Sequence, residues 1–172
     1  DMFVLNISCP NVKNLAKLQD TDTLKEIIEH LLSQRLFYDT HKPILLKLSP
    51  DLDEAQVDEI VDLVLSCGLD GIVACNTTNS RDKLTTNQSV IDAIGNGGLS
   101  GAPLFERTLE RVKYIYEKTE GKLPIIASGG VMTPIQAQQL LEAGASLVEV
   151  YTGFIYNGPS FAKKIINHLK KC

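Results

Sequence analysis

The 172-residue sequence lacks the features that mark several large classes of protein. No apolar run approaches the roughly 20 residues that a membrane-spanning helix needs. Lys and Arg number 17 against 21 Asp and Glu. This net charge of -4 argues against nucleic acid as a main partner, because neutralising phosphates requires clustered cations. The sequence contains neither a GxGxxG fingerprint nor a P-loop, which disfavours a Rossmann dinucleotide site and an NTPase.

Metal sites and Cys–His hydrolases are also disfavoured. The four cysteines form no CxxC pair, and no histidine stands at metal-ligand spacing, so we expect no zinc site. Free thiols in a reducing compartment are favoured over disulfides. The three histidines fall on predicted helices or in a loop, away from strand ends, and are given no catalytic role: His30, His41 and His168.

What the sequence does contain is five short apolar runs rich in branched residues. Their near-continuous hydrophobicity, without period-two alternation, is typical of parallel strands that are covered on both faces. The predicted strands are Met2 to Ser8, Ile44 to Ser49, Gly71 to Asn76, Pro124 to Gly129, and Leu147 to Tyr151.

Helices are predicted between these strands. Thr23 and Glu26 form a capping-box pair for a helix that runs to Gln34. Asp53 caps a helix that ends at Gly68. The remaining helices are predicted at Ser89 to Ile94, Leu104 to Thr119, Pro134 to Gly144 behind the cap Thr133, and Ser160 to Lys171, whose closing lysines are expected on a solvated face. The long polar segment from Thr77 to Pro103 is expected to cover or form a site.

Repeated βα units indicate a parallel α/β fold and leave two architectures open, a doubly wound open sheet and a (β/α)8 barrel. Five units are fewer than a barrel has, since a barrel typically takes about 250 residues. Because the first strand starts at the second residue, we expect the sequence to be the later part of a longer chain.

Polar side chains follow the strands where each of them ends. In both architectures these ends meet on one face, and that face carries the site. After the first strand, Pro10 ends the extended segment and is expected to hold the Cys9 thiol facing outward. The other strand ends supply Lys47; Cys75, Asn76, Thr77 and Thr78; Ser128, Gly129 and Gly130; and Tyr151, Thr152 and Gly153.

Lys47 interrupts an apolar strand, where a charge is costly to bury. Either its amine reaches solvent at the strand end, or it is a cation held for an anionic ligand or cofactor. The glycines Gly129, Gly130 and Gly153 lie where barrels often bind phosphate through backbone N–H groups, after the last two strands.

Several motifs, in order, resemble those of the dihydroorotate dehydrogenases. They are Asn6-Ile7-Ser8-Cys9-Pro10-Asn11, Leu46-Lys47-Leu48-Ser49-Pro50-Asp51-Leu52, Asn76-Thr77-Thr78 with Arg81, Gly97-Gly98-Leu99-Ser100-Gly101, and Pro124 to Gly130 followed by Tyr151-Thr152-Gly153. The likeness covers nearly the whole chain, residues 1–172. It corresponds to the C-terminal part of that family's barrel, from about the fourth strand to the eighth, so the opening strands and any membrane-associating helices would lie upstream of Asp1.

The resemblance implies a (β/α)8 TIM barrel that binds FMN and oxidises (S)-dihydroorotate to orotate in pyrimidine biosynthesis. It makes Cys9 the base that removes the C5 proton while hydride passes from C6 to the flavin. It makes Lys47 the cation that stabilises negative charge on the reduced flavin. By the same resemblance, the substrate-binding residues are Asn6, Asn11, Asn76 and Thr77, and the cofactor-binding residues are Asn6, Lys47, Cys75, Gly101, Gly129, Gly130, Tyr151 and Thr152.

The class within the family is indicated by more than one motif. The Asn-Thr-Thr, Leu-Ser-Pro-Asp-Leu and Gly-Gly-Leu-Ser-Gly motifs resemble the membrane-associated, quinone-using class, in which the base is usually Ser. Cys9 instead resembles the soluble classes, and Cys75 stands where a Thr is expected. Because more motifs favour the first class, we expect a quinone acceptor and peripheral attachment at the cytoplasmic side of the membrane for the full-length protein.

Two other interpretations stay open at this point. The chain could belong to another FMN- or phosphate-binding barrel enzyme, or be an inert fragment that binds FMN weakly. An open partial barrel leaves two unpaired strand edges, which favour disorder or association, so a homo-oligomer is a further expectation.

Overall fold

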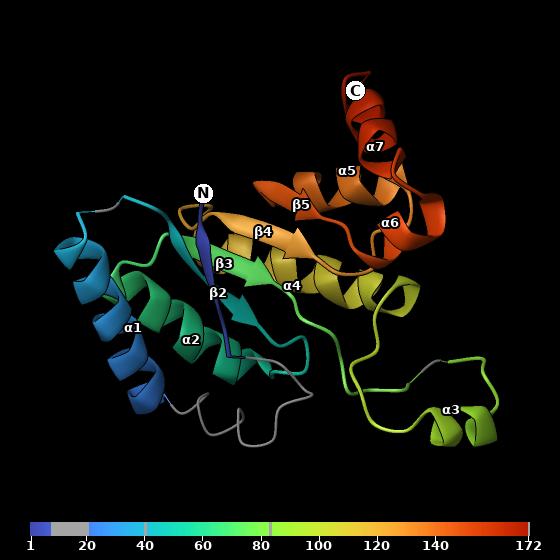
Figure 1. Ribbon diagram of the computed structural model, residues 1–172, viewed down its shortest axis with the longest axis horizontal. Helices are drawn as coiled ribbons and strands as arrows, with labels where there is room; N and C mark the ends of the chain where they lie inside the picture. The colour runs from blue at the N-terminus through green and yellow to red at the C-terminus, as the bar shows by residue number, and fades with distance from the viewer. Residues whose placement is uncertain (8–20, 40, 83, 172) are drawn as a thin grey trace.

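The computed structural model describes residues 1–7, 21–39, 41–82 and 84–171. These residues form an α/β fold around one five-stranded parallel sheet (Figure 1). Its strands are β1 (Phe3–Asn6), β2 (Ile44–Leu48), β3 (Gly71–Ala74), β4 (Ile125–Ser128) and β5 (Leu147–Glu149). All five predicted strands are therefore confirmed, and each ends slightly earlier than predicted.

The strand order decides between the two architectures that the sequence left open. Consecutive strands are neighbours throughout, in the order β1-β2-β3-β4-β5. A doubly wound sheet would reverse its order at a switch point and carry helices on both faces. Here the order never reverses, and the long helices lie on one side of the sheet (Figure 1), as in part of a (β/α)8 barrel.

Seven α-helices and one 3₁₀ turn accompany the strands in the described residues. They are α1 (Thr21–Phe37), α2 (Glu54–Cys67), α3 (Gln88–Ile94), the 3₁₀ turn η2 (Ala102–Leu104), α4 (Phe105–Lys118), α5 (Pro134–Glu142), α6 (Thr152–Asn157) and α7 (Phe161–Leu169). The sequence predicts all of these helices except α6. That helix has β-branched and aromatic residues and a glycine in its six positions, which are poor intrinsic helix formers.

The predicted helix caps are confirmed at α2 and α5 but not at α1. Asp53 accepts a hydrogen bond from the Gln56 backbone N–H at 2.8 Å, and Gly68 ends the helix in the left-handed conformation. Helix α1 begins at Thr21, so the predicted capping box at Thr23 is wrong. A capping residue must stand outside the helix, and Thr23 lies within its first turn.

The main hydrophobic core fills the space between the sheet and the helices. Along β2, Ile44, Leu46 and Leu48 point into this core, whereas Leu45 and Lys47 point to the opposite face. We call the face that carries Ile44, Leu46 and Leu48 the outer face of the sheet, and the face that carries Leu45 and Lys47 the inner face. On the inner face, Leu45, Val73 and Ile126 form a small buried cluster of their own.

The expectation that the strands are covered on both faces holds for β2, β3 and β4 only. Val4 is paired with Leu45, and Leu147 with Ile126, so both belong to the inner face. They nevertheless remain 39% and 54% exposed. In the described residues, the inner face is therefore open at its two edge strands.

The polar segment after β3 leaves the sheet, forms α3 and returns to η2. Figure 1 shows α3 projecting away from the layers, and none of its residues is buried. An antiparallel bridge between Thr78 and Leu99 closes the base of this excursion. Only the base of the segment therefore lies near the strand ends.

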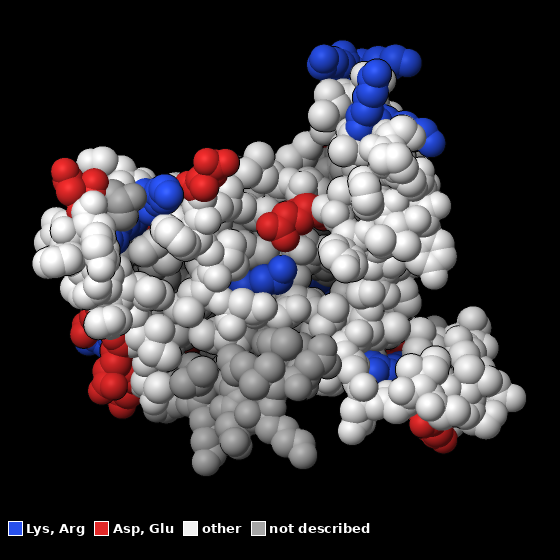
Figure 2. Space-filling view, in the orientation of Figure 1, with Lys and Arg blue, Asp and Glu red and all other residues white. Residues whose placement is uncertain are grey.

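Figure 2 shows basic side chains gathered over α7, near the C-terminus. The closing lysines are exposed there, as predicted. No helix in the described parts of the chain is long and apolar enough to cross a bilayer.

Candidate functional site

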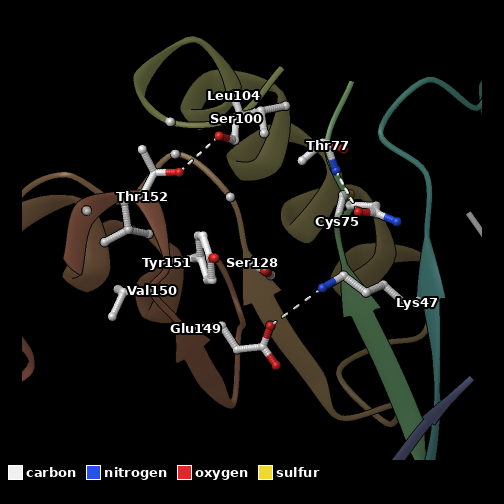
Figure 3. Close-up of a pocket in the computed structure, with 16 residues that line it drawn as sticks. Lys47, Cys75, Thr77, Ser100, Leu104, Ser128, Glu149, Val150, Tyr151 and Thr152 are labelled. Carbon is white, nitrogen blue, oxygen red and sulfur yellow. Dashed lines mark hydrogen bonds and ion pairs between the residues drawn. The ribbon is translucent and has the colours of Figure 1, made fainter. Parts of the chain in front are cut away.

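A cavity of about 380 Å³ lies at the carboxyl ends of β2 to β5, on the inner face of the sheet (Figure 3). Cofactor sites typically enclose roughly 300–1,000 Å³, so its size fits a small-molecule ligand. It is lined by Lys47, Cys75, Asn76, Thr77, Ser100, Gly101, Leu104, Ser128, Gly129, Gly130, Val131, Glu149, Val150, Tyr151, Thr152 and Gly153.

Most of the predicted site residues meet in this one cavity. Its lining includes Lys47, Cys75, Asn76, Thr77, Gly101, Gly129, Gly130, Tyr151 and Thr152. Asn6 does not line it, but its Oδ1 accepts a hydrogen bond from Asn76 Nδ2 at 3.1 Å. The predicted base Cys9 and the predicted substrate ligand Asn11 lie outside the described residues.

Asn76 is held in a defined position at the end of β3. Its backbone N–H donates to the Leu48 carbonyl at 2.8 Å, and its Oδ1 accepts the Thr77 backbone N–H at 2.9 Å. Together with the bond to Asn6, these contacts fix both ends of the amide. The ends of β1, β2 and β3 are thereby joined beside the cavity, where a planar polar ligand could meet several amides.

Lys47 projects from β2 into the cavity and faces Glu149 of β5 (Figure 3). Its Nζ lies 3.8 Å from Glu149 Oε2. The Lys47 side chain is 21% exposed, so its ammonium is partly shielded from solvent where it faces the cavity. The structure therefore places a cation at the cavity, as the alternative interpretation requires.

Cys75 has the opposite character to a reactive thiol. It is buried, and burial raises the pKa of its thiol to about 12, although the nearby cations, Arg111 foremost, act in the opposite direction. A thiol with this pKa is protonated at neutral pH and is a poor nucleophile. Cys75 can therefore shape the cavity wall but is not suited to supply a base.

Gly130 allows the turn after β4 to approach the start of α4 closely. Its φ of +78° lies in the left-handed region, and a Cβ there would lie 2.3 Å from the Phe105 backbone nitrogen. Only glycine fits both conditions. The conformation of the turn after β4 is therefore determined by its close packing against the backbone of α4. Because Gly130 has no side chain, none covers the backbone N–H groups of the turn at this position.

A polar brace supports the rim of the cavity from behind. Asp51 accepts hydrogen bonds from Arg107 at 2.7 Å, from the Asn79 backbone N–H at 2.8 Å and from the Thr78 hydroxyl. This brace explains why Asp51 belongs to the Ser-Pro-Asp-Leu motif: it ties the loop after β2 to the loop after β3.

Arg81 similarly holds together the two ends of the polar segment that leaves the sheet after β3 and returns to η2. Its guanidinium donates to the carbonyl oxygens of Thr78 at 3.3 Å and Asn79 at 3.2 Å, and also to that of Gly97. Two sequence motifs are thus joined by one side chain, and the cavity-lining residues at either end of the excursion are held near each other.

Sequence reasoning missed two polar cavity residues, Glu149 and Ser100. Ser100 accepts a hydrogen bond from the Thr152 hydroxyl at 3.0 Å (Figure 3). Glu149 interrupts the last apolar strand just as Lys47 interrupts the second. Each of these two predicted buried strands contains one charged residue, and the charges are of opposite sign. This pattern could have predicted that Lys47 and Glu149 face each other. The described residues contain no cluster of metal-ligating side chains.

Comparison with known proteins places the chain in a family. The family model described as dihydroorotate dehydrogenase matches residues 1–172. A relative from Trichodesmium erythraeum, named dihydroorotate dehydrogenase (quinone), is 43% identical over 99% of this chain and 46% of its own length. A relative of the same name from Nocardia farcinica is 42% identical over 96% of this chain and 45% of its own length.

Solved structures agree with the sequence relatives. The structure of Eimeria tenella DHODH in complex with ferulenol superposes with a TM-score of 0.90 at 35% identity, covering 98% of this chain and 49% of that one. The ligand-free structure of DHODH from the same organism gives 0.87 at 36% identity. The chain spans about half the length of the relatives it matches. The chain belongs to the dihydroorotate dehydrogenase family.

Proposed function

We propose that the protein containing this chain oxidises (S)-dihydroorotate to orotate with bound FMN, in pyrimidine biosynthesis. The observation that carries the proposal is the convergence of a cation, paired amides and a glycine turn in one cavity at the strand ends. The names of relatives that are 42–43% identical over nearly all of this chain support the same activity.

The residues of the cavity fit FMN in size and in chemistry. Its volume of about 380 Å³ suits a cofactor, and its lining offers one lysine, several hydroxyls and glycines from the segments that follow β3, β4 and β5. We propose that the loop containing Gly129 and Gly130, together with Thr152, holds the phosphate group. Lys47, at the floor of the cavity, would hold the ring system.

In this proposal, FMN supplies the acceptor for two electrons, and the chain supplies the rest. Asn76, Thr77 and Asn6, which are joined by hydrogen bonds to one another, would orient the flat pyrimidine, with Asn11 as a further expected contact. The Cys9 thiolate accepts the proton from C5 at its Sγ while the electron pair of the C6–H bond leaves with its hydrogen. Lys47, which lines the cavity, would favour a negatively charged form of the bound cofactor.

We further propose that the electron acceptor is a quinone, because the curated relatives carry that word in their names. A quinone is a lipid-soluble reactant, so this proposal goes with a peripheral position at the cytoplasmic side of the membrane for the full-length protein. Measuring dihydroorotate oxidation with a soluble quinone, fumarate and NAD in turn would test it, and activity with NAD alone would contradict it.

The role of Cys9 gives the proposal its sharpest test. In the complete protein, Cys9→Ala should abolish reduction of bound FMN by dihydroorotate, and Cys9→Ser should retain part of it. A free thiol has a pKa of about 8.5, so the wild-type rate should climb as pH rises from 6 to 8. Stopped-flow absorbance of the flavin measures these rates, and an alanine variant that reacts at the wild-type rate would refute the assignment.

A further inference from the structure

The two charges that line the cavity are of opposite sign and face each other. Among the described residues of the lining, Lys47 and Glu149 are the ones that carry formal charges. Their side chains come from β2 and β5 and point toward one another over the intervening strands (Figure 3). The formal charge of the described lining residues therefore sums to zero, although the family resemblance assigns a role to the cation alone.

The pair is not built to hold the fold together. At 3.8 Å, with side chains 21% and 46% exposed, it lies at the long end of ion-pair geometry. Partly exposed ion pairs of this kind contribute little to stability. In strand register, Glu149 stands beside Ser128, and Lys47 beside Val73, so both side chains belong to the inner face. Their position matters mainly for whatever occupies the cavity.

We propose that Glu149 sets the reduction potential of the bound flavin by offsetting the charge of Lys47. This inference rests on the proposed function, because it requires FMN in the cavity. A reduced flavin that carries negative charge is stabilised by a nearby cation and destabilised by a nearby carboxylate. Glu149 thus keeps the potential lower than Lys47 alone would make it, and passage of electrons onward to an acceptor is favoured.

The direction of the effect follows from the geometry. The long separation means that Glu149 does not fix the ammonium in place, so its removal chiefly changes the charge at the cavity. With glutamine at position 149 the described lining residues would carry one net positive charge. Reduced FMN should then bind more tightly relative to oxidised FMN, and the midpoint potential should rise.

The test uses the complete protein, with any residues that flank this sequence retained. Glu149→Gln should increase the ratio of reduced to oxidised FMN affinity on the order of tenfold, a rise of about 30 mV for a two-electron couple. Glu149→Asp keeps the charge and should stay near the wild-type potential, whereas Lys47→Met should shift it in the opposite direction. Glu110→Gln makes the same change at an exposed position on α4, outside the cavity, and serves as the control.

The readouts are the spectroscopic midpoint potential and the dissociation constant of oxidised FMN. A potential in Glu149→Gln that equals the wild-type value, or falls below it, would overturn the inference while leaving the proposed function intact. A wild-type protein that binds no FMN would overturn both. A rise of equal size in Glu110→Gln would also overturn it, since the effect would then reflect overall charge.

Discussion

The outer and inner faces of the sheet use the same strands for different purposes. On the outer face, side chains of β2, β3 and β4 are buried in one continuous core shared with the helices. On the inner face, the buried cluster has three members, and the inner-face positions at the carboxyl ends of β2, β4 and β5 are Lys47, Ser128 and Glu149. Alternation along a strand therefore assigns stability to one face and the candidate chemistry to the other.

The difference shows how a charge can stand in an apolar strand. Lys47 lies between Leu46 and Leu48, which are both fully buried, yet it points to the side where the cavity lies. Describing the strand as one apolar run hides the fact that successive side chains point to opposite faces of the sheet. A single misplaced charge in a predicted parallel strand is accordingly a useful sign of the face that carries a site.

Substituting neighbouring leucines on β2 gives the largest expected effect and compares the faces directly. Leu46→Ala, on the outer face, should lower the free energy of unfolding by about 2–5 kcal/mol, because close-packed neighbours cannot fill the space. Leu45→Ala makes the identical change on the inner face and should cost less, since its cluster is small and lies beside an open cavity. Urea unfolding measures both, and equal losses would erase the distinction between the faces.

Removing the brace behind the cavity should have an intermediate effect. Arg107→Ala deletes the hydrogen bonds to Asp51 and Thr78 and should cost about 1 kcal/mol of stability, because the arginine is partly exposed. The free energy of FMN binding should fall by more than the free energy of unfolding, since the loops at the rim lose a shared contact. Lys113→Ala, on the solvent side of the same helix, is the control. An Arg107 variant with normal FMN affinity would show that the brace does not serve the cavity.

The smallest expected effect lies in the helical layer and depends on pH. The Tyr114 hydroxyl donates to Asp58 at 2.9 Å and, with Lys118, holds the pKa of the Asp58 carboxyl below its ordinary 3.8. A lowered pKa stabilises the fold above the ordinary value and ceases to do so as pH falls through the lowered one. Asp58→Asn should therefore reduce stability more at pH 7 than at pH 3. Urea midpoints at both values test this, and an equal loss at each pH would exclude the ionic cause.

Local signals made much of the fold predictable. Asp53 and Gly68 mark both ends of α2, and the apolar runs mark every strand, because caps and hydrophobicity depend on near neighbours in sequence. The order of the strands could not be read this way, and neither could α6, whose intrinsic helix propensity is low. These features depend on packing between distant segments.

The same division applies to the candidate site. Residues at strand ends could be gathered in advance, because parallel strands deliver their ends to one edge. The contacts of Glu149 with Lys47 and of Asp51 with Arg107 could not, since each joins residues far apart in sequence through a geometry that only the folded sheet provides.

The central claim, that the inner-face cavity holds FMN beside a pyrimidine, is tested most directly by titrating orotate into the FMN-loaded complete protein. Our account predicts a saturable change in the flavin absorbance spectrum, weakened in Asn76→Ala because we propose that this amide orients the pyrimidine. A flavin spectrum that does not respond to orotate at any concentration would contradict it.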